Sequence, residues 1–299
     1  MSVLQERAGF LTEIAFDPVA DTYDETFTNS LIGRAQREVV WEELDRVFGR
    51  GDRVLELNCG TGVDALHLAN RGVVVLACDV APRMIDTANR RLSLMSVRAE
   101  ASAAGPAKIT APVAFRILAN ERIRQLRESA FAEFRPFDGA FSNFAGLNCV
   151  QDLIGFARDL ARLVKPRGQI VLCLFGRFCV WEILWYLAHG QTGKAFRRLR
   201  GGGCSASPSG KGTPVQVRYY SVRKLASIFG PEFRLKRWRG VGITVPPSYV
   251  EPLARRFPAA LDYLVSFDRR LGALPLLAAV ADHVLLTLER VEDHNSPGS

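Results

Sequence analysis

Short apolar runs alternate with helical patterns along the first part of the chain. A run at 53–57 (RVLEL) is followed by a glycine turn and a helical pattern through Arg71. A second run at 73–78 is followed by a turn and a helical pattern from Met84 to about Ser96. Because strand, turn and helix repeat in this order, the pattern predicts an α/β fold with a parallel sheet and right-handed crossovers.

The pattern continues to residue 290 with one interruption. Further predicted strands lie at 113–118, 138–143, 169–175, 233–241 and 283–290. Predicted helices lie at 29–48, 122–134, 152–164 and, in a region spaced by prolines, 246–280, and a tight turn is predicted at 165–168. Between 176 and 213 the alternation stops, and an aromatic-rich helix, a basic segment and a Gly/Ser-rich loop replace it.

The charge balance is moderately basic. The 299 residues carry a formal net charge of +8, and the pI is near 9.4. Such an excess suits an anionic partner such as nucleic acid, a membrane surface or a phosphorylated substrate, although a basic surface is also common where there is no such partner. Nucleic acid is not the partner that we expect.

Cysteine use and the apolar segments favour a cytoplasmic protein. The six cysteines form no CxxC pair and four lie in apolar, strand-like runs, which predicts free thiols, no disulfide and no metal. The N-terminus has no apolar core long enough for a signal peptide. The apolar stretch 169–190 contains Arg177 and Glu182, so a strand, a loop and an amphipathic helix explain it better than a membrane-spanning helix of about 20 residues.

The sharpest chemical signal is the sequence VLELNCGTG at 54–62. Small residues let a strand turn abruptly into a helix, and the free N–H groups at the start of that helix attract a carboxylate or a phosphate. Asp79 ends the second strand, and an acid at that point accepts hydrogen bonds from ribose hydroxyls. Asp79 can also cap the helix that begins near Pro82, and the two roles are compatible.

The details of this turn argue against a dinucleotide. Dinucleotide-binding loops have the pattern GxGxxG, whereas this loop reads NxGxG from Asn58. Glu56 on the first strand would repel a pyrophosphate, but it suits a ligand with an ammonium group, such as the methionine part of S-adenosylmethionine.

Four segments together resemble a known enzyme family. ELNCGTG and ACDVAPRMI resemble motifs I and II of class I S-adenosylmethionine-dependent methyltransferases, in particular the small-molecule branch that is similar to ubiquinone/menaquinone-biosynthesis methyltransferases. The upstream FDPVADTYDETF and the downstream KPRGQIVL also look like this family. The resemblance covers roughly residues 15–176 and returns at 218–290.

The resemblance implies a Rossmann-like, mostly parallel sheet of seven strands with an antiparallel last strand, helices on both faces and a helical cap. It divides the chain into an N-terminal helical lid (1–48), a cofactor-binding core (49–176), an inserted helical and loop cap (177–217), the remainder of the core with cap elements (218–290) and a disordered tail (291–299). The cofactor would be S-adenosyl-L-methionine, with S-adenosyl-L-homocysteine as the product.

The resemblance also assigns cofactor-binding roles. The methionine end would be lined by Glu56, Asn58, Gly60, Thr61 and Gly62, with Tyr23 and Arg37 closing over the carboxylate. Asp79 would hold the ribose, and Val80 and Met84 would pack on the adenine. Asn143 and Phe144, after the fourth strand, would border the methyl group and the acceptor, although Asn143 can equally cap a turn.

Two positions depart from the family pattern. Asn58 replaces its first glycine, and asparagine tolerates the left-handed conformation better than other non-glycine residues, so the turn can be kept. The acid that usually follows the third strand is not evident in RILANERI, where Asn120 or Glu121 is the best substitute.

In-line transfer of an activated methyl group requires alignment of the reactants and exclusion of water, so it needs neither a metal nor a Ser-His-Asp set. A base is needed only if the acceptor must lose a proton. An antiparallel last strand would bring His283 to the active-site end of the sheet, and His189 lies in the inserted region. Both are candidate general bases, and for both a structural role is the alternative.

The acceptor should contact the segments outside the common sheet. Aromatic residues in 177–250 favour an apolar or aromatic small molecule, which can be lipid-like, although Trp181 and Trp185 can equally be core residues. The basic cluster Lys194–Arg200 can meet an anionic membrane surface, or it can be a solvated face beside a loop. The sequence contains no indication of the oligomeric state.

Two other function classes compete with methyl transfer. A nicotinamide-dependent oxidoreductase would be expected to have the GxGxxG spacing and a hydride-transfer set, and we find neither. A non-catalytic nucleoside- or RNA-binding protein with a methyltransferase fold is compatible with the basic charge. An RNA-modifying enzyme would usually carry a motif such as NPPY after the fourth strand, where this chain reads SNFAG.

Overall fold

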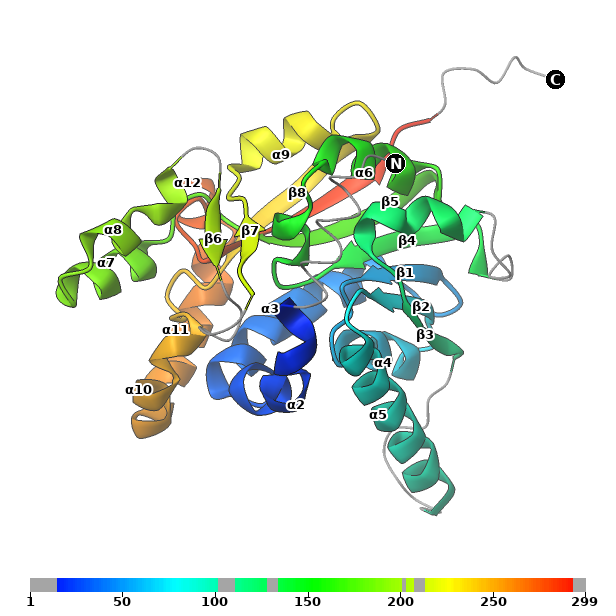
Figure 1. Ribbon diagram of the computed structural model, residues 1–299, viewed down its shortest axis with the longest axis horizontal. Coiled ribbons are helices and arrows are strands. Elements are labelled where there is room, and N and C mark those ends of the chain that lie inside the picture. Colours follow the sequence, from blue (N-terminus) through cyan, green and yellow to red (C-terminus); the bar gives the residue numbers. More distant parts are fainter. Residues whose placement is uncertain (1–14, 102–110, 128–133, 201–202, 207–212, 293–299) are drawn as a thin grey trace.

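The computed structural model describes residues 15–101, 111–127, 134–200, 203–206 and 213–292. Its centre is a seven-stranded sheet with the order β3-β2-β1-β4-β5-β9-β8 (Figure 1). The strands are β1 (Arg53–Leu57), β2 (Val74–Asp79), β3 (Val113–Ile117), β4 (Phe137–Ser142), β5 (Val164–Phe175), β8 (Phe233–Val241) and β9 (His283–Arg290). Strand β9 runs antiparallel to both of its neighbours, and the other pairs are parallel. The predicted fold is confirmed.

Helices cover both faces of the sheet. One face packs against α6 (Leu153–Ala161) and α9 (Val222–Phe229), and the other against α3 (Leu31–Val47), α4 (Val63–Asn70) and α5 (Pro82–Ala101). Successive side chains of a strand point to opposite faces, so Leu55 of β1 belongs to one apolar cluster and Val54 to the other. Both faces are therefore buried, as expected of a parallel sheet.

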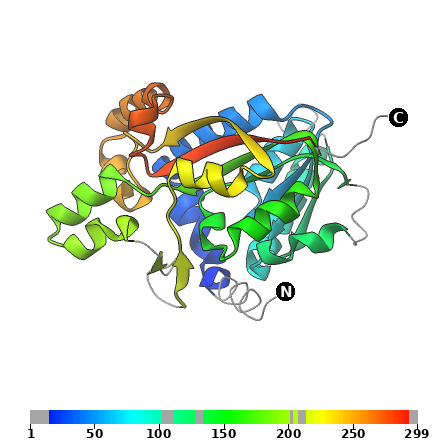
Figure 2. The ribbon, with the colours of Figure 1, turned by 90° about the horizontal axis from the view of Figure 1, so that it is seen from above.

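Additional elements lie beyond the carboxyl ends of the parallel strands. The N-terminal lid consists of η1 (Asp17–Val19), α2 (Ala20–Tyr23) and η2 (Asp24–Thr28). The inserted cap consists of α7 (Val180–Ala188), α8 (Thr192–Ala195), η6 (Arg197–Leu199) and a small hairpin of β6 (Cys204–Ala206) and β7 (Val215–Val217). The remaining elements are η3 (Asn120–Arg127), η5 (Gly146–Cys149), η7 (Ser248–Val250), α10 (Glu251–Arg256), α11 (Pro258–Leu271) and α12 (Pro275–Ala278). Figure 2 shows α10 and α11 at one edge of the molecule, away from α5.

Some boundaries differ from the prediction. The expected turn at 165–168 is part of β5, although Arg167 adopts the left-handed conformation (φ 64°) that a turn there would use. The helix expected at 122–134 is a 3-10 helix over Asn120–Arg127, and 128–133 lie outside the described residues. The hairpin of β6 and β7 was not predicted. Most of the tail predicted to be disordered, 293–299, also lies outside the described residues.

The apolar stretch at 169–190 divides as expected into the end of β5, a loop and α7. Among the described residues, no helix is long and apolar enough to span a membrane.

Candidate active site

The turn after β1 passes directly from the sheet into α4 through three residues with positive φ. These are Asn58 (φ 53°), Gly60 (φ 52°) and Gly62 (φ 77°). A Cβ atom on Gly62 would lie 2.7 Å from the Phe115 ring, so this position requires glycine for both its conformation and its space. The expectation that Asn58 takes the left-handed conformation in place of glycine is confirmed.

The Asn58 side chain ties the turn to the neighbouring strands. Its amide donates to the Ser142 hydroxyl at the end of β4, and its carbonyl accepts from the Asn120 amide after β3. A Cβ atom on Gly146 would lie 2.3 Å from Asn58 Cγ, so the chain after β4 approaches this side chain closely. The asparagine that departs from the family pattern therefore links three parallel strands at their carboxyl ends.

Asp79 at the end of β2 points toward the same turn. Its Oδ2 accepts a hydrogen bond from the Gly60 N–H at 2.8 Å, and its Oδ1 accepts one from the Ala81 N–H at 2.9 Å. Burial raises the pKa of this carboxyl, and the backbone donors oppose that shift. Asp79 thus stabilises both the turn and the start of the next connection, and each oxygen keeps lone-pair capacity for a further donor.

A buried ion pair lies behind the turn. Arg37 on α3 donates to Asp64 on α4 at 2.7 Å, and Asp64 also accepts from Trp41 Nε1 at 2.7 Å and Asn143 Nδ2 at 2.9 Å. Although burial opposes it, the Arg37 charge and these donors lower the pKa of Asp64. The Arg37 guanidinium lies 4.9 Å from the Phe144 ring centroid.

Glu56 is buried on the same side of β1. Burial and the nearby carboxylates raise its pKa well above the ordinary value, although Arg37 opposes this, and its Oε2 atom has no hydrogen-bond partner. Arg37 and Glu56 therefore lie behind the turn, and neither lines the cavity described next.

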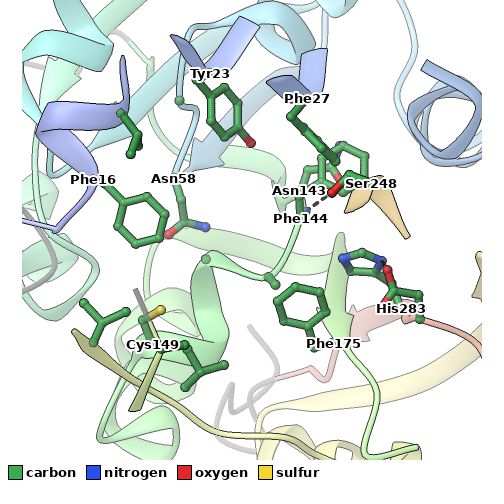
Figure 3. Close-up of a pocket in the computed structure, with 18 of the residues that line it drawn as sticks. Phe16, Tyr23, Phe27, Asn58, Asn143, Phe144, Cys149, Phe175, Ser248 and His283 are labelled. Atoms are coloured by element: carbon green, nitrogen blue, oxygen red, sulfur yellow. Dashed lines mark hydrogen bonds and ion pairs between the residues drawn. The ribbon is translucent and has the colours of Figure 1, made fainter. Parts of the chain in front are cut away.

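A cavity of about 800 Å³ lies above the carboxyl ends of the strands (Figure 3). Its wall contains eleven of the sixteen predicted site residues: Tyr23, Asn58, Gly60, Asp79, Val80, Met84, Asn120, Glu121, Asn143, Phe144 and His283. The other five are not part of the wall: Arg37, Glu56, Thr61, Gly62 and His189. His189 is exposed, and its Nδ1 contacts the Trp185 carbonyl oxygen at 2.7 Å.

One half of the cavity combines an apolar surface with polar groups. Val80, Met84, Leu118 and Phe16 line it, while Asp79 carries the buried carboxylate. Figure 3 shows the Phe16 ring beside Asn58 and the Tyr23 hydroxyl directed into the open space. Such a half can enclose a flat, apolar ring on one side and bind hydroxyl groups on the other.

The lid closes this half through contacts with the core. Asp24 accepts a hydrogen bond from the Thr61 hydroxyl at 2.7 Å and pairs with Arg91, and Arg83 pairs with Asp21. Thr61 therefore binds the lid and is not part of the cavity wall. These contacts bring Tyr23 over the glycine turn, and burial raises the pKa of its hydroxyl to about 12, so it is a neutral donor at ordinary pH.

The other half of the cavity centres on His283. The imidazole stacks on Phe175, with ring centroids 4.6 Å apart. It also contacts Phe144 in a T-shaped arrangement, with ring centroids 5.7 Å apart. Its Nδ1 is buried without a hydrogen-bond partner, 3.4 Å from the Asp282 carboxylate, which leaves Nε2 as the ring nitrogen available to the cavity. Burial, opposed by Asp282 and aided by the Arg198 charge, lowers the pKa of His283 below 6.5. The ring is therefore neutral at pH 7.

Of the two interpretations of the basic cluster at 194–200, a membrane contact or a solvated face, neither describes Arg198, which faces the interior. Arg198 is buried and donates to Asp282 at 2.6 Å and to Glu182 at 3.0 Å, and Arg197 forms a two-pronged pair with Glu182 at 2.8 and 3.0 Å. Arg197 and Arg198 thus form a charge-balanced network with the acid of α7 and the acid that precedes β9, because buried acids require cationic partners inside the fold. Lys194 and Arg200 remain exposed.

Several wall residues had not been predicted. Phe175 ends β5, so the rule that placed Asn143 at a strand end would also have found it. Tyr186, Ser248 and Tyr249 come from the cap and η7, where no sequence pattern points to the sheet. Trp185 packs on Tyr249 at 5.5 Å between ring centroids and belongs to an apolar cluster, whereas its neighbour Tyr186 lines the cavity.

This geometry agrees with a comparison with known families. Residues 32–229 match the model of the family described as methyltransferase domain. The chain belongs to the methyltransferase domain family. The resemblance predicted from the glycine turn and Asp79 is thereby confirmed.

Individual relatives are more distant. The chain is 32% identical over 79 residues to tRNA 5-carboxymethoxyuridine methyltransferase of Escherichia coli K12. This match covers 25% of this chain and 30% of that protein. It is 27% identical over 163 residues to demethylmenaquinone methyltransferase of Clavibacter sepedonicus. That match covers 54% of this chain and 56% of that protein. The chain thus spans about half or less of the length of these relatives.

Solved structures extend the similarity of the fold to nearly the whole chain. The CcbJ methyltransferase of Streptomyces caelestis matches with a TM-score of 0.55 at 15% identity, covering 94% of this chain and 99% of that one. Magnesium protoporphyrin IX methyltransferase of Synechocystis PCC 6803, solved with bound SAH, matches with a TM-score of 0.54 at 14% identity, covering 95% and 99%.

Proposed function

We propose that the protein is an S-adenosylmethionine-dependent methyltransferase that acts on a small apolar or aromatic acceptor. The observation that carries the proposal is the contact of Asp79 with the Gly60 N–H, which joins the buried carboxylate to the glycine turn at one end of a cavity of about 800 Å³. The neutral imidazole of His283 belongs to the other end of the same cavity.

The residues present fit this cofactor. Asp79 already accepts one backbone N–H on each oxygen, and its remaining lone pairs suit two ribose hydroxyls. Val80, Met84 and Leu118 form an apolar surface suited to an adenine ring. Glu56 and Arg37 each have a buried atom without a hydrogen-bond partner, but neither residue lines the cavity, so they add nothing to this fit.

Roles for the residues behind the wall follow from their contacts. Arg37 and Asp64 fix α3 to α4, and Asp64 orients Asn143 through its amide at 2.9 Å. We assign Arg37, Glu56, Thr61 and Gly62 to the support of the turn and the lid, and the wall residues to direct contact with the cofactor. The conformational demand on the turn is met before any ligand arrives, which favours tight binding.

When bound, S-adenosylmethionine supplies a methyl group that is already activated on a positively charged sulfur. The protein's residues then have to align the acceptor and exclude water. Phe144 and Phe175 border His283 and enclose the acceptor end with aromatic rings. His283 accepts a proton from an acceptor hydroxyl or acidic carbon through Nε2, and Asp282, held by Arg198, stabilises the imidazolium that forms.

The aromatic wall and the balanced charges favour an acceptor with an apolar body. Phe144, Phe175, Tyr186 and Tyr249 line this end, and the burial of the Tyr249 hydroxyl without a partner leaves one donor for the acceptor. The similarity to a quinone-biosynthesis enzyme, which covers half of the chain, supports a ring of this kind. The tRNA enzyme matches a quarter of the chain, too little to support a nucleic acid acceptor.

The two other function classes are less well supported. A nicotinamide oxidoreductase does not agree with the family to which the chain belongs, and a non-catalytic binding protein would leave the neutral, buried His283 without a role. Within the cluster 194–200, we propose a membrane contact only for Lys194 and Arg200, because these two side chains are exposed.

Turnover tests the proposal directly. The protein is incubated with S-adenosylmethionine labelled in the methyl group and either a panel of phenols, hydroquinones and their alkylated forms or, in a separate reaction, tRNA. Label is then measured in the extracted product. We expect label in hydroxylated ring compounds and none in tRNA. Label in tRNA alone would overturn the proposed acceptor class.

A further inference from the structure

The helices α10, α11 and α12 expose a set of large apolar side chains, which we call the α10–α12 surface. Each of them is at least half exposed: Leu253, Phe257, Tyr263, Phe267, Leu274 and Leu276. Leu276 on the short helix α12 is 89% exposed, and Tyr263 is 72% exposed. A surface leucine is common, but six large apolar side chains that lie close together in the chain, on three consecutive helices and the connections between them, call for a partner.

The spacing shows that α11 has two apolar faces. Ala260, Tyr263 and Phe267 lie three and four residues apart within α11, so they share one side of the helix, and all three are exposed. A different side of α11 contributes Leu261, Leu264 and Val265 to the apolar cluster shared with α3. A surface helix of a globular protein usually buries a single apolar stripe, so the outer stripe is additional.

Two of the four arginines between 251 and 281 are paired with acids, because Arg269 pairs with Glu38 and Glu42 of α3 and Arg255 pairs with Glu251. Among the described residues, Arg256 and Arg270 have no acidic side chain within ion-pair distance, whereas Arg255 pairs with Glu251 at 2.9 Å. Asp262 is the one exposed acidic side chain between 251 and 281. The segment 271–281 (LGALPLLAAVA) carries no charge at all. An apolar centre bordered by unpaired arginines complements a surface that is apolar inside and anionic outside.

We propose that the α10–α12 surface docks the protein on an anionic lipid bilayer. Leu274 and Leu276 enter the boundary between headgroups and acyl chains, while Arg256 and Arg270 contact the headgroup phosphates. A second copy of the chain fits less well, because a two-fold interface on this surface would bring the same unpaired arginines from both copies together. Anionic headgroups neutralise these arginines instead.

The position of the surface gives it a consequence for the cavity. The short helix η7 leads directly into α10, and its residues Ser248 and Tyr249 line the acceptor half of the cavity. Docking through α10–α12 would hold that half next to the bilayer, from which an acceptor with an alkyl tail can enter. This consequence rests on the proposed function, whereas the docking itself does not.

Vesicle flotation tests the docking with the full chain. The bound fraction is measured with phosphatidylcholine vesicles that contain or lack phosphatidylglycerol, for the wild type and for Leu276→Ser. The matched control is Leu94→Ser, because Leu94 is 62% exposed on α5, far from α10 and α11 in Figures 1 and 2. We expect Leu276→Ser to lower binding to the anionic vesicles about tenfold and Leu94→Ser to leave it unchanged.

A second pair of variants tests the charge. Arg270→Gln should lower binding to the anionic vesicles about fivefold, and Arg223→Gln on the exposed side of α9 should not. Calorimetric binding of S-adenosylhomocysteine by each variant reports whether the fold and the cofactor half are intact, so a failure of docking is distinguished from a failure of the proposed function.

Three results would overturn the proposal. The first is the absence of binding to anionic vesicles by a wild type that binds S-adenosylhomocysteine. The second is equal binding of Leu276→Ser and the wild type. The third is a dimer in light scattering that Leu276→Ser separates into monomers, because the surface would then be an interface between copies.

Discussion

The His283→Phe variant removes the proposed general base while it keeps an aromatic ring on Phe175. The stacked geometry, with centroids 4.6 Å apart, can accept a phenyl ring, and Asp282 keeps its partner Arg198. A positioned general base contributes about a hundred- to ten-thousandfold to a rate, which corresponds to roughly 3–5 kcal/mol of the barrier. We therefore expect kcat to fall by that factor while the affinity for S-adenosylhomocysteine stays the same, because His283 lies at the acceptor end of the cavity.

The pH dependence supplies a second measurement of the same group. The pKa of His283 is lowered below 6.5, so the base is deprotonated and active above that pH, and the rate should rise with pH through the acid range and level off before neutrality. The assay is methyl transfer to the best phenolic acceptor over a pH series. Asp282→Asn removes the carboxylate that raises this pKa and should shift the rise to lower pH.

NMR titration of the imidazole measures the pKa of His283 without any acceptor. A pKa above 6.5 would contradict the electrostatic argument. A His283→Phe variant with the full rate would refute the role of His283 as a base, whatever its pKa.

Three further predictions concern stability. Gly62→Ala forces a left-handed alanine whose Cβ lies 2.7 Å from Phe115, so urea denaturation should detect a loss of about 2–4 kcal/mol. Arg37→Met leaves Asp64 buried without its cation and should cost about 3–5 kcal/mol in the same assay, and a cost below about 1 kcal/mol would contradict the buried ion pair. Because the pKa of His283 is lowered in the fold, the unfolded chain binds more protons just below pH 6.5, so the melting temperature should fall as the pH drops through this range and should fall less in His283→Phe.

The sheet could be predicted from sequence because its signals are local. Strand β9 matches its prediction at both ends, since an uninterrupted apolar run is needed wherever both faces of a strand are buried. The left-handed Asn58 could also be predicted locally, because a strand end followed directly by a helix leaves few backbone conformations.

The inward-facing charges could not be predicted in the same way. Arg197 and Arg198 look like a solvated basic cluster in sequence, because their partners Glu182 and Asp282 lie 15 and 84 positions away. Nothing local distinguishes an arginine that faces water from one that neutralises a buried acid. Tyr186 and Tyr249 line the cavity for a related reason, since tertiary packing alone determines which aromatic residue of the cap turns inward.

The binding of a sulfonium nucleoside beside Asp79 can be measured by titration calorimetry with S-adenosylhomocysteine and, separately, with NAD, for the wild type and for Asp79→Asn. The account predicts that S-adenosylhomocysteine binds, that NAD does not, and that the variant loses about 1–3 kcal/mol of binding free energy while its melting temperature shows that it is folded. Tighter binding of NAD, or an equal affinity of the folded variant for S-adenosylhomocysteine, would contradict it.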